Sequence, residues 1–128
     1  MIVVDTNVMV YLLTGAGPGG EAARLLARDP EWAAPPILLS ELRNVMVGLL
    51  RRDQLDVTDA IEICQDAEAV LGDRLASVPA APVLEAAYEG GLTAYDAEFV
   101  VLARTLGVPL VTADRAILIG APDVAVAL

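Results

Sequence analysis

Lysine and histidine are both absent from the 128 residues of this chain. Without histidine, the commonest general base and metal ligand of proteins is missing, so carboxylates are the only evident catalytic groups. The eight basic residues are all arginine and stand against 18 acidic residues, which gives a net charge of −10. This charge repels the phosphates of nucleic acid, unless several of the acids bind divalent cations that reverse the local field.

Cysteine and long apolar runs are scarce as well. Cys64 is the single cysteine, so no internal disulfide can form, which fits a reducing compartment. Asp5 stands where a signal peptide would carry a basic residue, and no uncharged stretch reaches the ~18 apolar residues that a membrane span needs. We therefore expect a soluble, cytoplasmic protein that does not bind a membrane.

Hydrophobic residues make up 56% of the chain and are mostly Ala, Val and Leu, as in a compact aliphatic core. Residues 1–128 are expected to form one domain. Their patterns predict strands at 1–4, 32–35, 108–112 and 124–128, and helices at 5–13, 21–28, 37–52, 57–71, 83–88, 94–106 and after Asp114. Residues 15–20 are expected to be a flexible loop, and residues 77–82 a strand or connector. Such alternation predicts an α/β sandwich around a mostly parallel sheet.

Two of the expected strands lead to an acidic residue. Residues 1–4 lead to Asp5, and residues 108–112 lead to Asp114. Ligand sites in parallel sheets collect beyond the carboxyl ends of the strands. Each acid can equally be the N-cap of the helix that follows, a role whose loss costs only ~1 kcal/mol, and Thr93 and Asp96 likewise fit a capping box. Taken singly, none of these acids distinguishes a cap from a site.

Glu41 is harder to explain as a surface residue. It has apolar neighbours, and Arg43, two residues away, faces elsewhere on a helix. Ser40 and Asn44 flank the same side, which indicates a polar pocket at the edge of the core.

If these four carboxylates converged, their six pairs at about 5 Å would each repel by ~3 kcal/mol at an effective dielectric near 20, a total of ~20 kcal/mol. Either protons would be taken up, with raised pKa values, or divalent cations would be bound. An all-oxygen site suits Mg²⁺ or Mn²⁺, which activate water for hydrolysis. Periodicity alone does not show that the four side chains converge.

Three stretches together resemble the PIN-domain ribonucleases, in particular the VapC-type toxins of bacterial toxin–antitoxin pairs. They are VVDTNVMVYLL at 3–13, LLSELRNVMVGLLRR at 38–52 and GLTAYDAEFVVLARTLGVPLVTADRAIL at 91–118. The last is the most specific, because an acid on a helix, a strand and a second acid recur at the family's separations.

The resemblance implies a three-layer α/β/α sandwich with a central, mostly parallel sheet. It also implies a magnesium-dependent endoribonuclease, in which Mn²⁺ can take the place of Mg²⁺ as the cofactor. The family's acidic cluster falls on Asp5, Glu41, Asp96 and Asp114. Asn7 matches the polar residue after the first acid, and Thr112 matches a small polar residue beside the last one.

In this interpretation Asp5, Asp96 and Glu41 hold one metal, and Asp114 completes that site or helps to recruit a second ion. Arg43 and Arg115 are candidates for binding phosphate, although surface solubility explains either equally well. The implied partners are an RNA substrate, a small antitoxin whose C-terminal segment covers the acidic pocket, and a second copy in a homodimer.

The sequence is also compatible with two alternative functions. One is a non-catalytic PIN-like module that binds RNA or a partner protein. The other is a haloacid-dehalogenase-like phosphatase, which would need a second Asp where Asn7 stands and a lysine that the chain lacks. The sequence also leaves open whether the role is that of a toxin or of a housekeeping nuclease.

Overall fold

The computed structural model describes all residues from Met1 to Leu128 and contains four strands and seven helices. The strands form one sheet of order β2-β1-β3-β4, in which every neighbouring pair is parallel. They are β1 (Ile2–Val4), β2 (Trp32–Ala33), β3 (Leu110–Thr112) and β4 (Ala125–Ala127). The helices are α1 (Thr6–Thr14), α2 (Gly19–Arg28), α3 (Ile37–Arg51), α4 (Val57–Leu71), α5 (Ala80–Gly90), α6 (Ala94–Leu106) and α7 (Arg115–Gly120).

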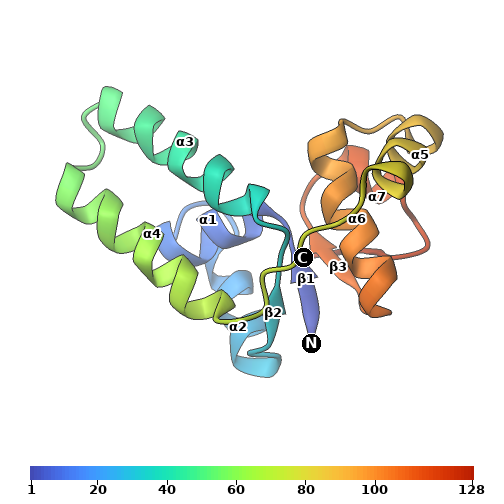
Figure 1. Cartoon of the computed structure of the whole chain (residues 1–128). Helices are drawn as coiled ribbons and strands as arrows, with labels where there is room; N and C mark the ends of the chain where they lie inside the picture. Colours follow the sequence, from blue (N-terminus) through green and yellow to red (C-terminus); the bar gives the residue numbers. More distant parts are fainter.

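Helices cover both faces of the sheet. Figure 1 shows α1 to α4 on one side of the strands and α5 to α7 on the other. The residues between the layers form a core of 28 buried apolar side chains, and β1 and β3, in the middle of the sheet, contribute fully or almost fully buried residues throughout. The expected three-layer α/β/α sandwich with a parallel sheet is therefore confirmed.

The strand order creates a topological switch point between β1 and β3. From β1 the chain passes through α1 and α2 to β2 on one side, whereas β3 lies on the other side of β1 and leads outward to β4. The connections on either side of this point run in opposite directions and leave a crevice beyond the carboxyl ends of the two central strands. Asp5 directly follows β1, and Asp114 follows β3 by two residues.

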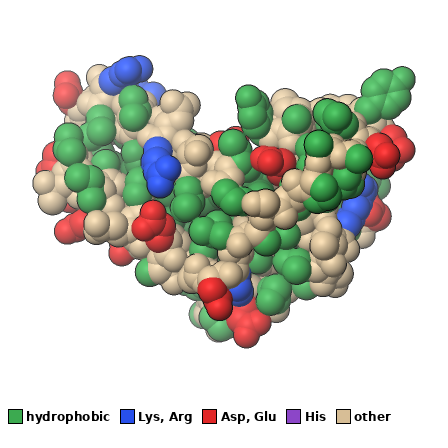
Figure 2. Space-filling view, in the orientation of Figure 1, with side chains coloured by type: hydrophobic (Ala, Val, Ile, Leu, Met, Phe, Trp, Pro, Cys, Tyr) green, Lys and Arg blue, Asp and Glu red, His purple; other side chains and the backbone are tan.

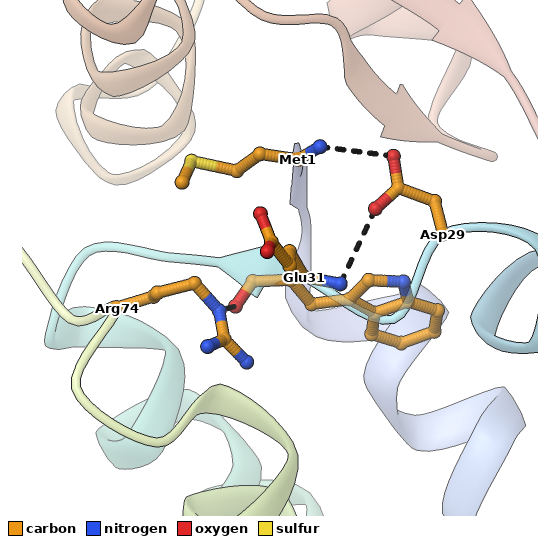
Figure 3. Close-up of polar contacts among 5 residues, drawn as sticks. Met1, Asp29, Glu31 and Arg74 are labelled. Carbon is orange, nitrogen blue, oxygen red and sulfur yellow. Dashed lines mark hydrogen bonds and ion pairs between the residues drawn. The ribbon is translucent and has the colours of Figure 1, made fainter.

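The short edge strand β2 is held in place by side chains from distant segments (Figure 3). The Asp29 carboxylate accepts hydrogen bonds from the Met1 ammonium group at 3.1 Å and from the Glu31 N–H at 3.2 Å. Arg74 donates from Nε to the carbonyl oxygen of Trp32 at 3.0 Å. These contacts fix the start of β2 against β1 and against the segment that follows α4.

Two helices begin earlier than the sequence patterns predict. α5 begins at Ala80, because Pro82 lies in its first turn, where the missing N–H has no intrahelical partner to lose. α2 begins at Gly19, inside the expected loop, and a Cβ on this residue would lie 2.9 Å from the carbonyl oxygen of Tyr11. Glycine is therefore needed where α2 packs against the end of α1.

The other helices follow the prediction closely. α4 and α6 have the expected bounds, and Gly107 ends α6 in the left-handed conformation, with φ 66°. The segment 77–82 contains no strand, and only Leu75, just before it, forms an isolated parallel bridge with Ala34. None of the helices is both long enough and apolar enough to cross a membrane.

Candidate active site

One cavity of about 400 Å³ lies at the switch point of the sheet. In Figure 2 a hollow separates the lobe formed by α3 and α4 from the lobe formed by α5 and α6, and acidic side chains lie in it. Four of the residues that line the cavity are the acids expected from the sequence, and each comes from a different segment: Asp5, Glu41, Asp96 and Asp114. The fold thus brings together positions that are up to 109 residues apart in the chain.

Asp5 is both a helix cap and a wall of this cavity. One carboxylate oxygen accepts the Val8 N–H at 3.0 Å and caps α1, while the other accepts a hydrogen bond from the Thr112 hydroxyl. The residue is only 5% exposed. Burial raises the pKa of Asp5, the two hydrogen bonds oppose this, and the charges of Asp114 and Asp96 raise the pKa further.

Thr112 joins the ends of the two central strands. Its hydroxyl donates to Asp5 and accepts the Asp114 N–H at 2.9 Å, and the side chain is fully buried. Asp114 in turn caps α7 by accepting the Ala116 N–H at 2.7 Å. Thr112 does not itself line the cavity, so it acts by positioning the two acids.

Asp96 lies in the first turn of α6. The cap of this helix is Thr93, whose hydroxyl accepts the Asp96 N–H at 3.1 Å, and the Asp96 carboxylate lines the cavity. Burial is the main cause of the raised pKa of Asp96. The charge of Asp114 raises the pKa further, and the Thr93 hydroxyl opposes both effects. The charge of Asp114 therefore acts on Asp96 in the direction expected of neighbouring acids.

Glu41 enters the cavity from α3, on the opposite wall. Its Oε1 accepts a hydrogen bond from the Thr6 hydroxyl at 2.7 Å. The expected polar pocket at the edge of the core is confirmed, since Ser40 and Asn44 also line the cavity. The sequence does not distinguish Thr6 as a site residue, because a threonine directly after a capping acid looks like part of the cap.

The remaining residues assigned to the site from the sequence are Asn7, Arg43 and Arg115, and only the first of them lines the cavity. Asn7 lines the cavity, as the resemblance implies. Arg43 does not, because it faces α4 and forms an ion pair with Glu68 at 3.8 Å. Arg115 is exposed at the start of α7 and is also outside the lining. No arginine lines the cavity, so neither proposed phosphate-binding residue has a structural contact with the acids.

The acids surround the cavity but do not form a compact cluster. No group of three or more Asp, Glu, Cys or His side chains is placed to share one metal ion. The tight convergence expected from the sequence is therefore not seen, because the oxygens of Asp5, Glu41 and Asp114 are turned toward their own hydrogen-bond partners. The donor chemistry nevertheless suits Mg²⁺, which commonly binds through one or two carboxylates and keeps several waters.

Residues 2–119 match the family described as the PIN domain. The chain belongs to the PIN-domain family. Within this family it is 32% identical over 116 residues to the VapC ribonuclease Mb0985 of Mycobacterium bovis and to ribonuclease VapC9 of Mycobacterium tuberculosis, covering 89% of this chain and 86% of each relative. The resemblance noted in the sequence is confirmed, and PIN-domain membership decides against the haloacid-dehalogenase alternative.

Solved structures share the PIN fold at lower identity. PAE2754 from Pyrobaculum aerophilum superimposes with a TM-score of 0.78 at 23% identity and covers 97% of this chain and 81% of its own. A toxin–antitoxin complex from Klebsiella pneumoniae gives a TM-score of 0.70 at 23% identity, with coverage of 98% and 96%. FitAcB from Neisseria gonorrhoeae gives 0.71 at 21% identity, with coverage of 100% and 97%. At these identities the comparison establishes the fold alone.

Proposed function

We propose that this chain is a metal-dependent endoribonuclease and the toxin of a toxin–antitoxin pair. The observation that carries the proposal is that four acids from four segments line one cavity at the switch point of a PIN fold. Its relatives over most of the chain are named as VapC ribonucleases, which supports RNA as the substrate.

The site residues are suited to a divalent cation for an electrostatic reason. Burial and neighbouring charge raise the pKa values of Asp5 and Asp96, so their ionised forms are disfavoured while no cation compensates them. We assign Asp5, Asp96 and Glu41 as metal ligands, directly or through water, with Asp114 completing the site. Bound Mg²⁺ or Mn²⁺ would supply an activated water and offset the charge that develops on phosphorus.

Thr112, Thr6 and Asn7 then have supporting roles. Thr112 and Thr6 hold the carboxylates of Asp5 and Glu41 in fixed orientations. The hydrogen bond from Thr112 also favours the ionised form of Asp5. Asn7 adds an uncharged amide to the cavity wall.

The proposed partners follow from charge and from exposed apolar surface. A cavity with four acids and no arginine suits an antitoxin segment that presents a basic residue. For a homodimer, the helical hairpin of α3 and α4 leaves Val47, Val57 and Ile61 exposed at 38%, 62% and 52%. The toxin–antitoxin complex from Klebsiella pneumoniae shares this fold, which supports an antitoxin as partner.

Cleavage of a fluorogenic single-stranded RNA tests the ribonuclease proposal. We expect turnover with Mg²⁺, loss of turnover in EDTA, and at least about a 100-fold loss in Asp5→Asn, because this substitution removes the charge but keeps a good helix cap. Glu98→Gln is the matched control: Glu98 is an acid on α6, two residues from Asp96, that does not line the cavity. Turnover that survives EDTA or Asp5→Asn would refute the metal-dependent mechanism.

A non-catalytic RNA-binding module is the second candidate. The lack of a ready-made group of three metal-binding side chains favours it. RNA binding without cleavage at any Mg²⁺ or Mn²⁺ concentration would support this module instead. The toxin role is tested separately: expression of the wild-type chain should arrest growth, Asp5→Asn should not, and a gene for a small DNA-binding protein should adjoin this one.

A further inference from the structure

Tyr95 lies beside Asp96 in the first turn of α6 and lines the candidate active site. It is 61% exposed, so core packing does not explain an aromatic ring at this position. Phe99, one helical turn further along α6, also lines the cavity but is only 1% exposed. The same face of α6 therefore carries one ring in the core and one ring at the mouth of the site.

The rest of the lining offers little that could attract an RNA chain. It contains four carboxylates and no arginine, so no cationic side chain forms part of the cavity wall. The uncharged polar side chains on the α1 and α3 side of the cavity are Thr6, Asn7, Ser40 and Asn44. Besides these side chains and a bound cation, contacts to bases can supply affinity, since every base has a π-face on which an aromatic ring can stack.

We infer that Tyr95 binds the RNA substrate by stacking its ring on an unpaired nucleobase next to the phosphodiester at the acidic site. This inference rests on the proposed ribonuclease function and adds a substrate-binding residue to it. A stacked base must be unpaired, so the substrate bound here is a single-stranded segment or loop. Tyr95 thus contributes to the choice of the nucleotide beside the cleaved bond.

Tyr88 provides a matched comparison within the chain. It is 91% exposed, lies on α5 and does not line the cavity. If exposed tyrosines of this protein only contributed polarity to the surface, the removal of either ring would have the same small effect. If Tyr95 stacks on a base at the site, removal of its ring should weaken RNA binding, and removal of the Tyr88 ring should not.

Steady-state cleavage of an unstructured RNA with Mg²⁺ tests the inference. Stacking on an aromatic ring is worth about 1–3 kcal/mol per base, so Tyr95→Ala should raise KM about tenfold or more, with kcat changed less than about threefold. Tyr95→Phe keeps the ring and should match the wild type, as should Tyr88→Ala. In an RNA with an abasic nucleotide at the contacted position, the wild type and Tyr95→Ala should have the same KM.

The inference is overturned if Tyr95→Ala keeps the wild-type KM, if Tyr95→Phe is as impaired as Tyr95→Ala, or if Tyr88→Ala loses as much. If the wild type cleaves no RNA, the proposed function fails, and the stacking contact is then measured by fluorescence anisotropy of intact labelled RNA. In that assay a wild type that binds no more tightly than Tyr95→Ala also overturns the inference.

Discussion

A single carboxylate at Asp5 has the two roles that the sequence presents as alternatives. One oxygen caps α1, and the other is held by Thr112 at the wall of the cavity. The sequence identifies this acid because it interrupts an apolar run, and it identifies Glu41 because an acid lies among apolar helix residues. It does not identify Thr6 or Tyr95, because a hydroxyl beside a cap and a ring on a helix surface are ordinary local features whose meaning depends on what lies opposite.

The raised pKa of Asp5 predicts a specific dependence of stability on pH. Between the unfolded value near 3.8 and the higher folded value, the folded chain binds more protons at this carboxyl than the unfolded chain. In EDTA, the contribution of Asp5 to the free energy of unfolding is therefore fully present below the unfolded pKa and is lost as the pH rises through the folded pKa. Urea unfolding over a pH series, compared between the wild type and Asp5→Asn, measures this difference.

Asp123 serves as a control, because its pKa is shifted in the opposite direction from that of Asp5. Hydrogen bonds from Arg104, at 2.9 Å, lower the pKa of Asp123, so its contribution is present above its unfolded pKa and is lost as the pH falls through the folded value. The difference between the wild type and Asp123→Asn should therefore grow with pH, and that for Asp5→Asn should shrink. A pH-independent difference for Asp5→Asn would contradict the assignment of Asp5 as a buried, destabilised acid.

Among the secondary-structure elements, those with explicit end signals were predicted best. α6 begins at a Thr93 cap and ends at Gly107, and α4 begins at an Asp56 cap, so their bounds can be read locally. α2 and α5 begin with glycine or contain proline in the first turn, and local patterns treat both residue types as breaks. Their true starts depend on tertiary contacts, such as that of Gly19 with the backbone of α1.

The contact between α5 and α7 offers a prediction about packing. A Cβ on Gly90, at the end of α5, would lie 2.7 Å from the carbonyl oxygen of Gly120, at the end of α7. Gly90→Ala should therefore force these helix ends apart and destabilise the fold by about 1–3 kcal/mol. Urea unfolding measures the change.

Gly48→Ala is the matched control. Its added methyl group would meet only the flexible Arg52 side chain, at 3.5 Å, so the better helix propensity of alanine should stabilise α3 by up to about 1 kcal/mol. If Gly90→Ala were as stable as the wild type, the close backbone contact between α5 and α7 would be disproved.

The order of the strands in the sheet decides whether the acids meet. Neither the order β2-β1-β3-β4 nor the position of α3 opposite α6 follows from local patterns, since strands of two or three residues pair with any neighbour of suitable polarity. Only the family resemblance predicted the shared cavity. Even so, it predicted a tighter cluster than the one found, because the cap and hydroxyl contacts that orient the carboxylates of Asp5, Glu41 and Asp114 cannot be read from the motif.

Mg²⁺ can stabilise a chain with a net charge of −10 in two ways, by binding at the acids of the cavity or by screening the net charge. If the acids of the cavity bind Mg²⁺, the folded state gains stability with metal concentration, by about 2.7 kcal/mol when the metal is at 100 times its dissociation constant. Thermal unfolding should therefore show a higher Tm in Mg²⁺ than in NaCl of equal ionic strength, and EDTA should reverse the gain. Asp5→Asn should lose most of the difference, and an equal rise in both salts would mean that screening of the net charge is the whole effect.

The connector that follows α4 separates the chain into two parts, each with half of the acids. The part that ends with α4 contains Asp5 and Glu41, and the part that begins with α5 contains Asp96 and Asp114. A chain cut in this connector, near residues 76–79, would thus give two fragments that each carry two of the four acids, and only their association would restore the complete set. If the chain cleaves RNA as proposed, fusing the two fragments to two interacting proteins would make RNA turnover a signal that those proteins have met.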